Sequence, residues 1–407
     1  MKFSIAHDVL LNAVEKGGLS FFSGDNQADQ LRDSIPTLKC LKLLVEEETI
    51  KIESSTGFSS STFVCKDKSL EIKEAGTVCI DALRLKNSLK SIQYPHLVKI
   101  EVEGNLKEKT EDSVSILGKA SFSAINEKGR ESFKEYYDVY SPEDFVDVSY
   151  FDEQPCILKI PPKDFSKALD SVSFVSEEDP FSELFDHVSI FSEDGNVHVA
   201  ATDNKRAALF TFKEEIDVMG VDKPLLIRTK VAKEMVKELP LDIDFVEIST
   251  SPDEDFIIFK MNSFKVRASL PPKEIRSKFP TFSKAINMET KARVSFNSIK
   301  ELKQTISRLC ADSIYGTFDI QKDKEIVTIK SFKSSLNGKV SCEKIDNSLD
   351  EPITLSIYFI KEILKKVSSK DSSCIKFSFS NDEKRIVIHG ESTSPFYLTQ
   401  KIIPFDA

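Results

Sequence analysis

Apolar residues recur at helical spacing in three segments of the chain, residues 80–92, 227–239 and 355–367, which align with one another without a gap. In the first segment, Leu85, Leu89 and Ile92 are separated by four and then three residues, so a helix would place them on one face. The matching apolar residues in the other two segments are Ala232, Val236, Leu239, Ile360, Leu364 and Val367. The pattern predicts three copies of one module, each containing this helix.

Lysines lie beside the apolar stripe at the same two positions of each predicted helix. They are Lys86 and Lys90, Lys233 and Lys237, and Lys361 and Lys365. Residues four apart lie one turn apart on the same side of a helix, so each pair forms a basic ridge. A single lysine-rich face is usually a solvated surface, but its repetition at matching positions favours a shared function in binding an anionic partner.

A second helix is predicted near the start of each module, directly after a short alternating strand at residues 3–5, 158–160 and 294–296. In the rest of each module the hydrophobic period falls to two, as expected for strands. We therefore expect two helices and seven or eight strands in each module. The boundaries are predicted near residues 144–155 and 286–291, and the stretch 17–34 is predicted to be an exposed polar loop.

Composition and charge are those of a globular protein with three domains. The 407 residues carry a formal charge of −10, which argues against nucleic-acid binding over the whole surface, whereas the positive charge gathers on the three repeated helices. Seven cysteines without a CxxC pair indicate neither a disulfide framework nor a zinc site. The sequence lacks the pattern of a signal peptide and any run of about 20 apolar residues, so we expect an intracellular soluble protein without a membrane partner.

The motifs of common enzymes are missing from the sequence. The histidines are scattered, and no HExxH, GxSxG, GxGxxG or GxxxxGK[ST] pattern occurs. The acidic runs at residues 177–179 and 253–255 could bind a cation, but they lack regular ligand spacing and are more typical of solvated loops. We expect no catalytic residue, no metal site and no cofactor, although a site assembled from distant residues would leave no motif.

Four short segments resemble a known family when they are taken in order. Residues 201–208, Ala-Thr-Asp-Asn-Lys-Arg-Ala-Ala, resemble the ATDxxRxA signature in the middle domain of bacterial DNA sliding clamps, the beta subunits of DNA polymerase III. Residues 34–38 are similar to the TLPIL-type segment of that family, residues 276–286 to its RFPDY-type segment, and residues 402–407 to its MPxRL-like tail. The octapeptide alone could be an ordinary hairpin turn, but the joint order of the motifs and the triple repeat cover essentially the whole chain.

The resemblance implies an α+β fold of three tandem DNA-clamp (processivity-fold) modules, each with two helices packed on antiparallel sheet. It places the N-terminal, middle and C-terminal clamp domains at residues 1–146, 147–286 and 287–407. A head-to-tail homodimer of such subunits forms a ring around duplex DNA without sequence preference. The implied function is that of a non-enzymatic processivity factor, cytoplasmic and associated with the nucleoid, which tethers the replicative polymerase, the clamp loader and other proteins with clamp-binding motifs.

The resemblance and the lysine ridges together predict residues that face DNA. These are Lys86, Lys90, Lys230, Lys233, Lys237, Tyr315, Lys361 and Lys365. Cations that contact phosphates supply affinity without reading sequence, which suits a ring that slides.

The resemblance also predicts a cleft between the middle and last domains, in which an extended peptide from a partner inserts apolar side chains. The matching positions are Phe185, Thr202, Asn204, Lys205, Arg206, Ala207, Pro280, Lys284, Ala285, Phe359, Ile403, Pro404 and Phe405. At the subunit interface, Phe122 matches an aromatic residue of the first domain, and Leu309 and Cys310 match its apolar counterpart in the third.

Two other hypotheses stay open at the level of sequence. Asp406 stands where the family has an arginine, and Asp179 adds negative charge to a loop that the family often turns toward DNA. Both features fit a monomeric clamp-like scaffold that binds proteins and never encircles DNA, and a concentration-independent monomer mass would favour it. A hydrolase with a dispersed acidic site would instead require metal-dependent turnover.

Overall fold

The computed structural model of the chain describes residues 1–23, 35–92, 97–103, 116–146, 154–176, 184–193, 195–203, 205–212, 223–280, 289–321, 324–347, 349, 351–367, 374–380, 385–390 and 396–400. They fold into two compact units. One unit comprises the described residues within 1–166 and 230–272, and the other comprises those within 167–212, 223–229 and 273–400.

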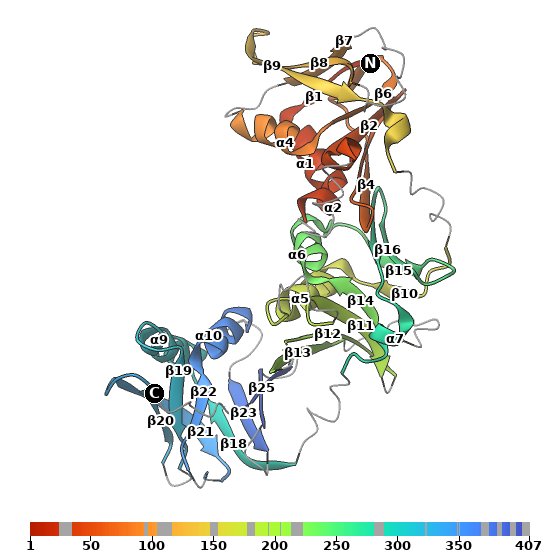
Figure 1. Ribbon diagram of the computed structural model, residues 1–407. Helices are drawn as coiled ribbons and strands as arrows, with labels where there is room; N and C mark the ends of the chain where they lie inside the picture. Colours follow the sequence, from red (N-terminus) through yellow and green to blue (C-terminus); the bar gives the residue numbers. More distant parts are fainter. Residues whose placement is uncertain are drawn as a thin grey trace. The chain divides into compact units, whose positions relative to one another are not determined.

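The order strand, helix, four strands, helix, three strands occurs three times among the described elements, and the first repeat adds α2, η1 and β5 to it (Figure 1). The first repeat contains β1 (Lys2–Ala6), α1 (His7–Gly17), α2 (Leu19–Phe22), η1 (Pro36–Lys39), β2 (Cys40–Glu46), β3 (Thr49–Ser55), β4 (Ser59–Cys65), β5 (Glu71–Glu74), β6 (Gly76–Asp81), α4 (Ala82–Ser91), β7 (Leu97–Glu103), β8 (Ile116–Ile125), β9 (Glu131–Tyr140) and η2 (Pro142–Asp144). The second contains β10 (Leu158–Ile160), α5 (Pro162–Val172), β11 (His187–Glu193), β12 (Asn196–Thr202), β13 (Arg206–Thr211), β14 (Leu225–Arg228), α6 (Thr229–Glu238), β15 (Val246–Thr250), β16 (Phe256–Met261), β17 (Phe264–Ser269) and α7 (Lys273–Arg276). The third contains β18 (Thr290–Phe296), α9 (Ile299–Cys310), β19 (Tyr315–Asp319), β20 (Ile326–Ser331), β21 (Asn337–Ile345), β22 (Ile353–Ser356), α10 (Ile357–Lys366), β23 (Ile375–Ser380), β24 (Arg385–Gly390) and β25 (Phe396–Gln400).

The gapless alignment of three segments is confirmed by the bounds of the helices α4, α6 and α10. Each has 10 residues and begins directly after the strand that precedes it, β6, β14 or β22. Asp81 caps α4 by accepting a hydrogen bond from the Arg84 amide at 2.7 Å, and Ser356 caps α10 by accepting one from the Phe359 amide at 3.1 Å. These side chains satisfy amides that have no partner within the helix, which fixes where the helix begins.

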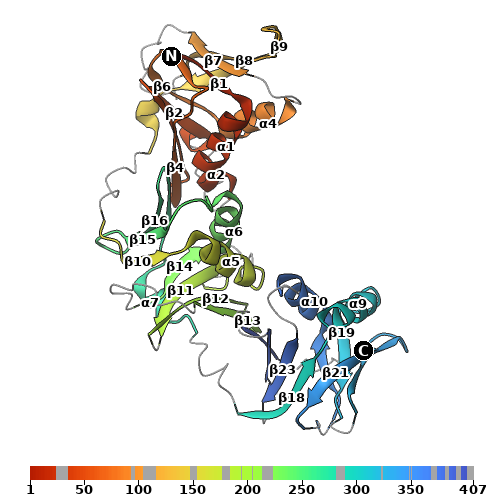
Figure 2. The ribbon, with the colours of Figure 1, turned by 180° about the vertical axis from the view of Figure 1, so that it is seen from behind.

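The predicted apolar stripes are buried, with two corrections. Leu85 and Leu89 of α4 and Ile360, Leu364 and Val367 of the third segment lie in the core, whereas Ile92 is only half-buried. In the second segment Ala232 and Leu239 are buried as predicted, but Met235 lies in the core in place of Val236, which is half-buried. The first helix of a repeat packs beside this one: α1 contacts α4, and α9 contacts α10, on one face of their strands (Figures 1 and 2).

Each repeat is joined to the next by strand pairing. Strand β17 of the second repeat pairs antiparallel with β4 of the first, and β25 of the third pairs antiparallel with β13 of the second. The described strands therefore form one sheet of 13 strands and another of 12 strands. All described pairings in them are antiparallel, so the α+β fold class is confirmed.

One expectation about a loop was wrong. Part of the predicted polar loop at residues 17–34 is the helix α2, in which Leu19 and Ser20 are buried, while residues 24–34 lie outside the described part. The strand β9 was not assigned from the sequence, because its many exposed residues obscure the period of two. Within the described residues, no helix has both the length and the apolar character needed to cross a bilayer.

Truncating Leu85 tests the role of the repeated stripe. Leu85→Ala removes a fully buried side chain from α4, so the free energy of unfolding of its unit should fall by about 2–5 kcal/mol. Thermal unfolding followed by circular dichroism would show the lower midpoint. The exposed Leu241 is the matched control, and Leu241→Ala should change stability by less than about 0.5 kcal/mol. Equal effects of the two substitutions would contradict the assignment of the core face.

Candidate functional site

The ridge lysines have the same exposure in each repeat. The second lysine of each helix is prominently exposed: 53% for the side chain of Lys90, 62% for Lys237 and 58% for Lys365. The first lysine of each helix, at 86, 233 and 361, is half-buried beside the apolar stripe. The helix period places both on one side, and the structure thus confirms a basic ridge on each helix taken by itself.

The ridge lysines also have anionic neighbours. Glu15 of α1 lies 3.6 Å from the Lys86 Nζ and 3.1 Å from the Lys90 Nζ, and the Lys86 ammonium lies 3.8 Å from the ring centre of Phe22. The hydrogen bond to Glu362 and the nearby charge of that carboxylate raise the pKa of Lys365 above its ordinary value, so this lysine is charged at neutral pH.

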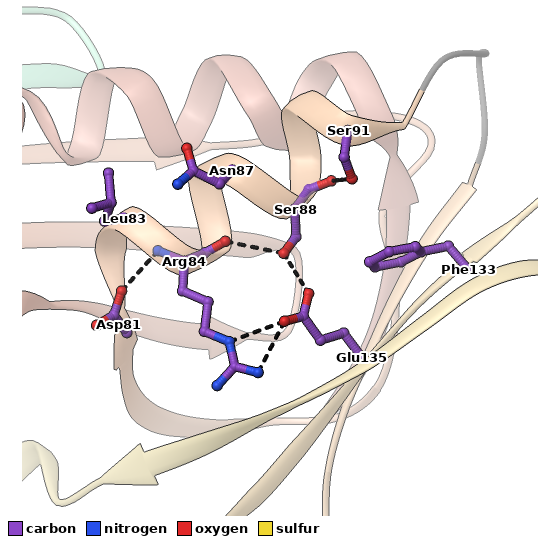
Figure 3. A pocket seen from close by; sticks show the side chains of 8 residues that line it. All are labelled: Asp81, Leu83, Arg84, Asn87, Ser88, Ser91, Phe133 and Glu135. Carbon is purple, nitrogen blue, oxygen red and sulfur yellow. Dashed lines mark hydrogen bonds and ion pairs between the residues drawn. The ribbon is translucent and has the colours of Figure 1, made fainter.

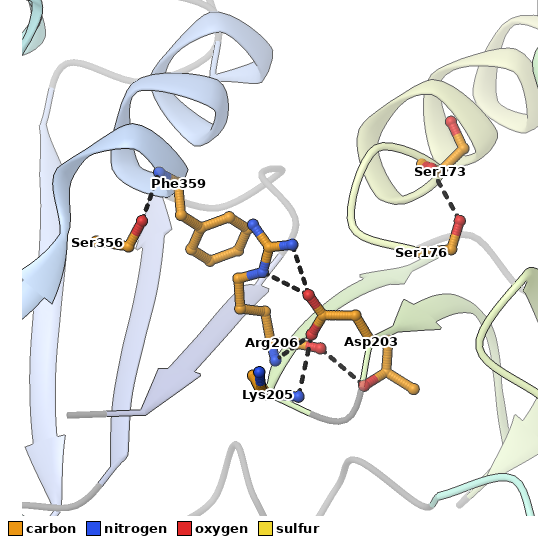
Figure 4. Close-up of polar contacts among 8 residues, drawn as sticks. Ser173, Ser176, Asp203, Lys205, Arg206, Ser356 and Phe359 are labelled. Carbon is orange, nitrogen blue, oxygen red and sulfur yellow. Dashed lines mark hydrogen bonds and ion pairs between the residues drawn. The ribbon is translucent and has the colours of Figure 1, made fainter. Parts of the chain in front are cut away.

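The turn between β12 and β13 is built around one carboxylate. Asp203, only 5% exposed, accepts hydrogen bonds from the amides of Lys205 at 3.0 Å and Arg206 at 2.6 Å. Its other oxygen accepts from the Arg206 guanidinium, from Nε at 2.6 Å, and lies 2.5 Å from Nη2 (Figure 4). The Thr202 hydroxyl donates to the Arg206 carbonyl at 2.7 Å. The chain therefore fixes the direction of the Arg206 side chain before any ligand arrives.

Arg206 connects the second repeat to the third. Its guanidinium carbon lies 4.8 Å from the ring centre of Phe359 at the start of α10, within the range of a cation–π contact. Phe359 also stacks on Phe174 at 5.9 Å between ring centres, and Phe174 contacts Tyr397 of β25 at 5.8 Å. Burial raises the pKa of the Tyr397 hydroxyl, which therefore stays neutral. Four side chains from both repeats thus form an aromatic and cationic cluster, in which Phe359 and Tyr397 are fully buried and Phe174 and Arg206 are half-buried.

A pocket of about 460 Å³ lies between α4 and β9 of the first repeat (Figure 3). Arg84 and Glu135 form an ion pair across it at 2.9 Å, and the Ser88 hydroxyl donates to Glu135 at 2.6 Å. Burial disfavours the charge of Glu135, but the hydrogen bonds from Ser88 and Arg84 outweigh it and hold the pKa of this carboxyl below its ordinary value. Leu83, on the same helix, is more than half exposed at the pocket.

Comparisons with known proteins identify the fold. No protein-family model matches the chain, and no curated protein matches its sequence. Solved structures match it over its whole length.

The DNA polymerase sliding clamp from Bacillus subtilis gives a TM-score of 0.78 at 16% sequence identity, covering 100% of both chains. The beta subunit of DNA polymerase III from Thermotoga maritima gives 0.78 at 14% identity, covering 99% of this chain and 100% of that one. A putative DNA polymerase III beta subunit from Eubacterium rectale gives 0.77 at 18% identity, covering 99% of both chains.

The chain has the sliding-clamp fold. The resemblance inferred from four short motifs is therefore confirmed at the level of fold, over the full length and not only at those motifs. The sequence identities lie far below those that carry residue roles from one protein to another. The roles of individual residues depend on the geometry of this chain.

The structure brings together part of the predicted clamp cleft. Thr202, Lys205, Arg206 and Ala207 lie on one turn, which reaches Phe359 through Arg206. Phe185 is half-buried before β11, and Pro280 is exposed after α7. The remaining predicted cleft residues lie outside the described residues: Asn204, Lys284, Ala285, Ile403, Pro404 and Phe405.

Two members of the cluster, Phe174 and Tyr397, were missed by sequence reasoning. A turn in which Asp203 bonds to the local backbone was expected from the motif itself, and the amide bonds of Lys205 and Arg206 confirm it. Phe174 follows the helix α5 with no distinguishing pattern, and Tyr397 lies on an ordinary strand. Their contacts depend on the pairing of β13 with β25, which joins residues far apart in the sequence.

The predicted DNA and interface residues have different surroundings. Tyr315 is half-buried at the start of β19, and Lys230 is half-buried in the first turn of α6. Phe122 lies on β8, between β7 and β9, and is fully buried against Phe133 and Tyr137. Leu309 is also fully buried, whereas Cys310 is half-buried at the end of α9. Among the described residues, no group of acidic, histidine or cysteine side chains could hold a metal ion.

Removing the Asp203 carboxylate tests whether it organises the cluster. Asp203→Ala leaves two amides and the Arg206 guanidinium without their acceptor, so local stability should fall by about 1–3 kcal/mol. Hydrogen exchange measured by mass spectrometry should show faster exchange in β13 and β25. Lys205→Ala, which alters an exposed side chain of the same turn, should leave exchange unchanged, and protection of both strands in Asp203→Ala would refute this role.

Proposed function

We propose that the protein is a DNA sliding clamp, a ring-forming processivity factor with no catalysis of its own. The observation that carries the proposal is the repeated basic ridge: three helices of equal length, each with an exposed lysine at its ninth residue and a half-buried lysine one turn earlier. A full-length match to sliding-clamp structures supports it. Lysines at equivalent positions suit contact with a repeating anionic polymer, and duplex DNA presents phosphates in this way.

The proposed domains are the clamp domains at residues 1–146, 147–286 and 287–407. In this proposal the ridge lysines, with Lys230 and Tyr315, face the duplex and contact its backbone without reading its sequence. The protein acts in the cytoplasm, at the nucleoid. It needs no cofactor for this function, because encirclement and tethering involve no chemical step.

A head-to-tail homodimer follows from the way in which the repeats join within one chain. The last strand of a repeat pairs with a strand of the preceding repeat, β17 with β4 and β25 with β13. By the same rule, β9 of one copy pairs with β21 of another. Among the described residues, Glu131–Asp138 and Asn337–Ser341 each pair with one strand only, β8 and β20 respectively. The Asn337 carbonyl and the Ser341 amide also bond to Arg308 and Glu301 of α9, and these side chains would have to yield to a second copy.

The same rule refines the residues of the subunit interface. Cys310 lies as far beyond Phe296 of β18 as Phe174 lies beyond Ile160 of β10, and Phe174 packs against the next repeat. Cys310 is therefore proposed to contact the α4–β9 pocket of the second copy. Phe122 has both strand edges paired and no exposed surface, so its contribution is to support β9 from the core.

The partner cleft is proposed at the Arg206–Phe359 cluster. The half-buried ring of Phe174 offers an apolar contact to an extended peptide, whereas the rings of Phe359 and Tyr397 are fully buried beneath it. The oriented guanidinium of Arg206 can donate hydrogen bonds to peptide carbonyl or carboxylate oxygens. The replicative polymerase, the clamp loader and other proteins with clamp-binding motifs are the proposed partners at this cleft.

Reversing the charge of two ridge lysines tests DNA contact. Lys90→Glu combined with Lys237→Glu should weaken binding to a fluorescent duplex at least about ten-fold at low salt, because each lost phosphate contact lowers the salt-dependent affinity. Fluorescence anisotropy at several salt concentrations would measure the effect. Lys66→Glu with Lys278→Glu changes net charge equally at exposed positions off the helices and should have a much smaller effect. Equal losses in both variants would count against the ridge.

Thiol labelling tests the subunit interface. Cys156 and Cys310 are both half-buried, but only Cys310 lies at the proposed joint. Labelling of Cys310 by iodoacetamide should therefore slow as the protein concentration rises, while Cys156 reacts at a constant rate. If the ratio of the two labelling rates does not change with protein concentration, and the mass remains that of a monomer, the hypothesis of a monomeric scaffold is favoured over that of a ring.

A further inference from the structure

Every ridge carries a carboxylate that pairs with its second lysine. The Lys90 Nζ lies 3.1 Å from Glu15, the Lys237 Nζ lies 2.5 Å from Glu234, and the Lys365 Nζ lies 2.7 Å from Glu362. These three glutamates, Glu15, Glu234 and Glu362, are called the paired carboxylates below. The lysine best exposed for contact with DNA is thus already matched with an anion in all three repeats.

The paired carboxylates reach the lysine by two different routes. Glu234 and Glu362 are the sixth residues of α6 and α10, three residues before the lysine. The sixth residue of α4 is Asn87, which carries no charge, and Glu15 of the packed helix α1 supplies the carboxylate in that repeat. The same pairing is therefore present although the repeated sequence position has changed, which a chance arrangement of surface charges does not explain.

The two partners of each pair differ in exposure. The carboxylate side chains are 25% exposed for Glu15, 20% for Glu234 and 23% for Glu362. The lysines are more than half exposed, and their long side chains can reorient. The lysine ammonium can consequently move to another anion while the carboxylate stays near the helix surface.

We propose that the paired carboxylates compete with DNA phosphates for the second ridge lysine, so that the ring is held on DNA mainly by encirclement and only weakly by adhesion. This inference rests on the proposed function. Each lysine must leave a carboxylate before it contacts a phosphate, and it regains that carboxylate when the ring moves on. The net gain per contact is small, which keeps the barrier between successive phosphate positions low.

The inference separates two roles that charged pairs on a helix can have. An ion pair three residues apart also supports its own helix slightly. That structural role predicts a small loss of stability when the carboxylate is neutralised and no effect on DNA. Competition predicts tighter DNA binding in the same variant.

The test compares two triple variants with equal net charge. Glu15→Gln, Glu234→Gln and Glu362→Gln together remove the paired carboxylates. The control, Glu47→Gln, Asp253→Asn and Glu325→Gln, neutralises three exposed carboxylates, one in each repeat and off these helices. Binding of each full-length protein to a fluorescent duplex is measured by anisotropy over a series of sodium chloride concentrations, and thermal midpoints are recorded alongside.

Competition predicts that the first variant binds the duplex at least about three-fold more tightly than the control, because exposed ion pairs contribute roughly 1.4- to 5-fold at each of the three sites. The slope of log affinity against log salt should also become steeper, by up to about 0.9 for each released lysine. Equal affinities and slopes for the two variants, with the wild-type protein binding DNA, would overturn the inference alone. If the wild-type protein and both variants fail to bind DNA at any salt concentration, the proposed function fails and the inference with it.

Discussion

Antiparallel strand pairing between neighbouring repeats is the interaction on which the rest of the structure depends. The backbone hydrogen bonds of β17 with β4 and of β25 with β13 extend the sheets of one repeat into the next. The paired strands bring together side chains that lie far apart in the sequence. The Asp203–Arg206 turn meets Phe359 only because β13 and β25 are neighbours, and the cluster would be lost if that register slipped. In the proposed ring, the same interaction continues in a second copy at Glu131–Asp138 of β9 and Asn337–Ser341 of β21, which have one strand partner each among the described pairings.

Each of the repeated helices has one buried apolar face and a row of lysines beside it. One face of α4 or α10 is buried against its partner helix and strands, and the lysines at the fifth and ninth residues stand beside that face. Three helices repeat this geometry in a chain with a charge of −10, so each presents an equivalent basic area on an acidic protein. In the proposed function such areas hold an anionic polymer, and in the further inference the paired carboxylates weaken its adhesion.

Much of the fold could be predicted from the sequence because it depends on local patterns that occur three times. The alignment of 80–92, 227–239 and 355–367 gave helix bounds that the structure confirms, since Asp81 and Ser356 cap them from within the same segments. The half-exposed strand β9 was missed because its side chains do not alternate clearly between apolar and polar. The Phe174, Phe359 and Tyr397 contacts could not be predicted, because they depend on long-range strand register and not on spacing. The pairing of Glu15 with Lys90 could not be predicted either, because Glu15 lies on another helix, far from Lys90 in the sequence.

The central claim, that copies of this chain close into a ring around DNA, is tested most directly by electron microscopy of the purified protein in negative stain, with particles averaged without imposed symmetry. The account predicts closed rings with six lobes, three from each of two copies, and a hole wide enough for a DNA duplex. Solid particles or isolated crescents across a range of protein concentrations would contradict it, because the edges of β9 and β21 would then remain unpaired.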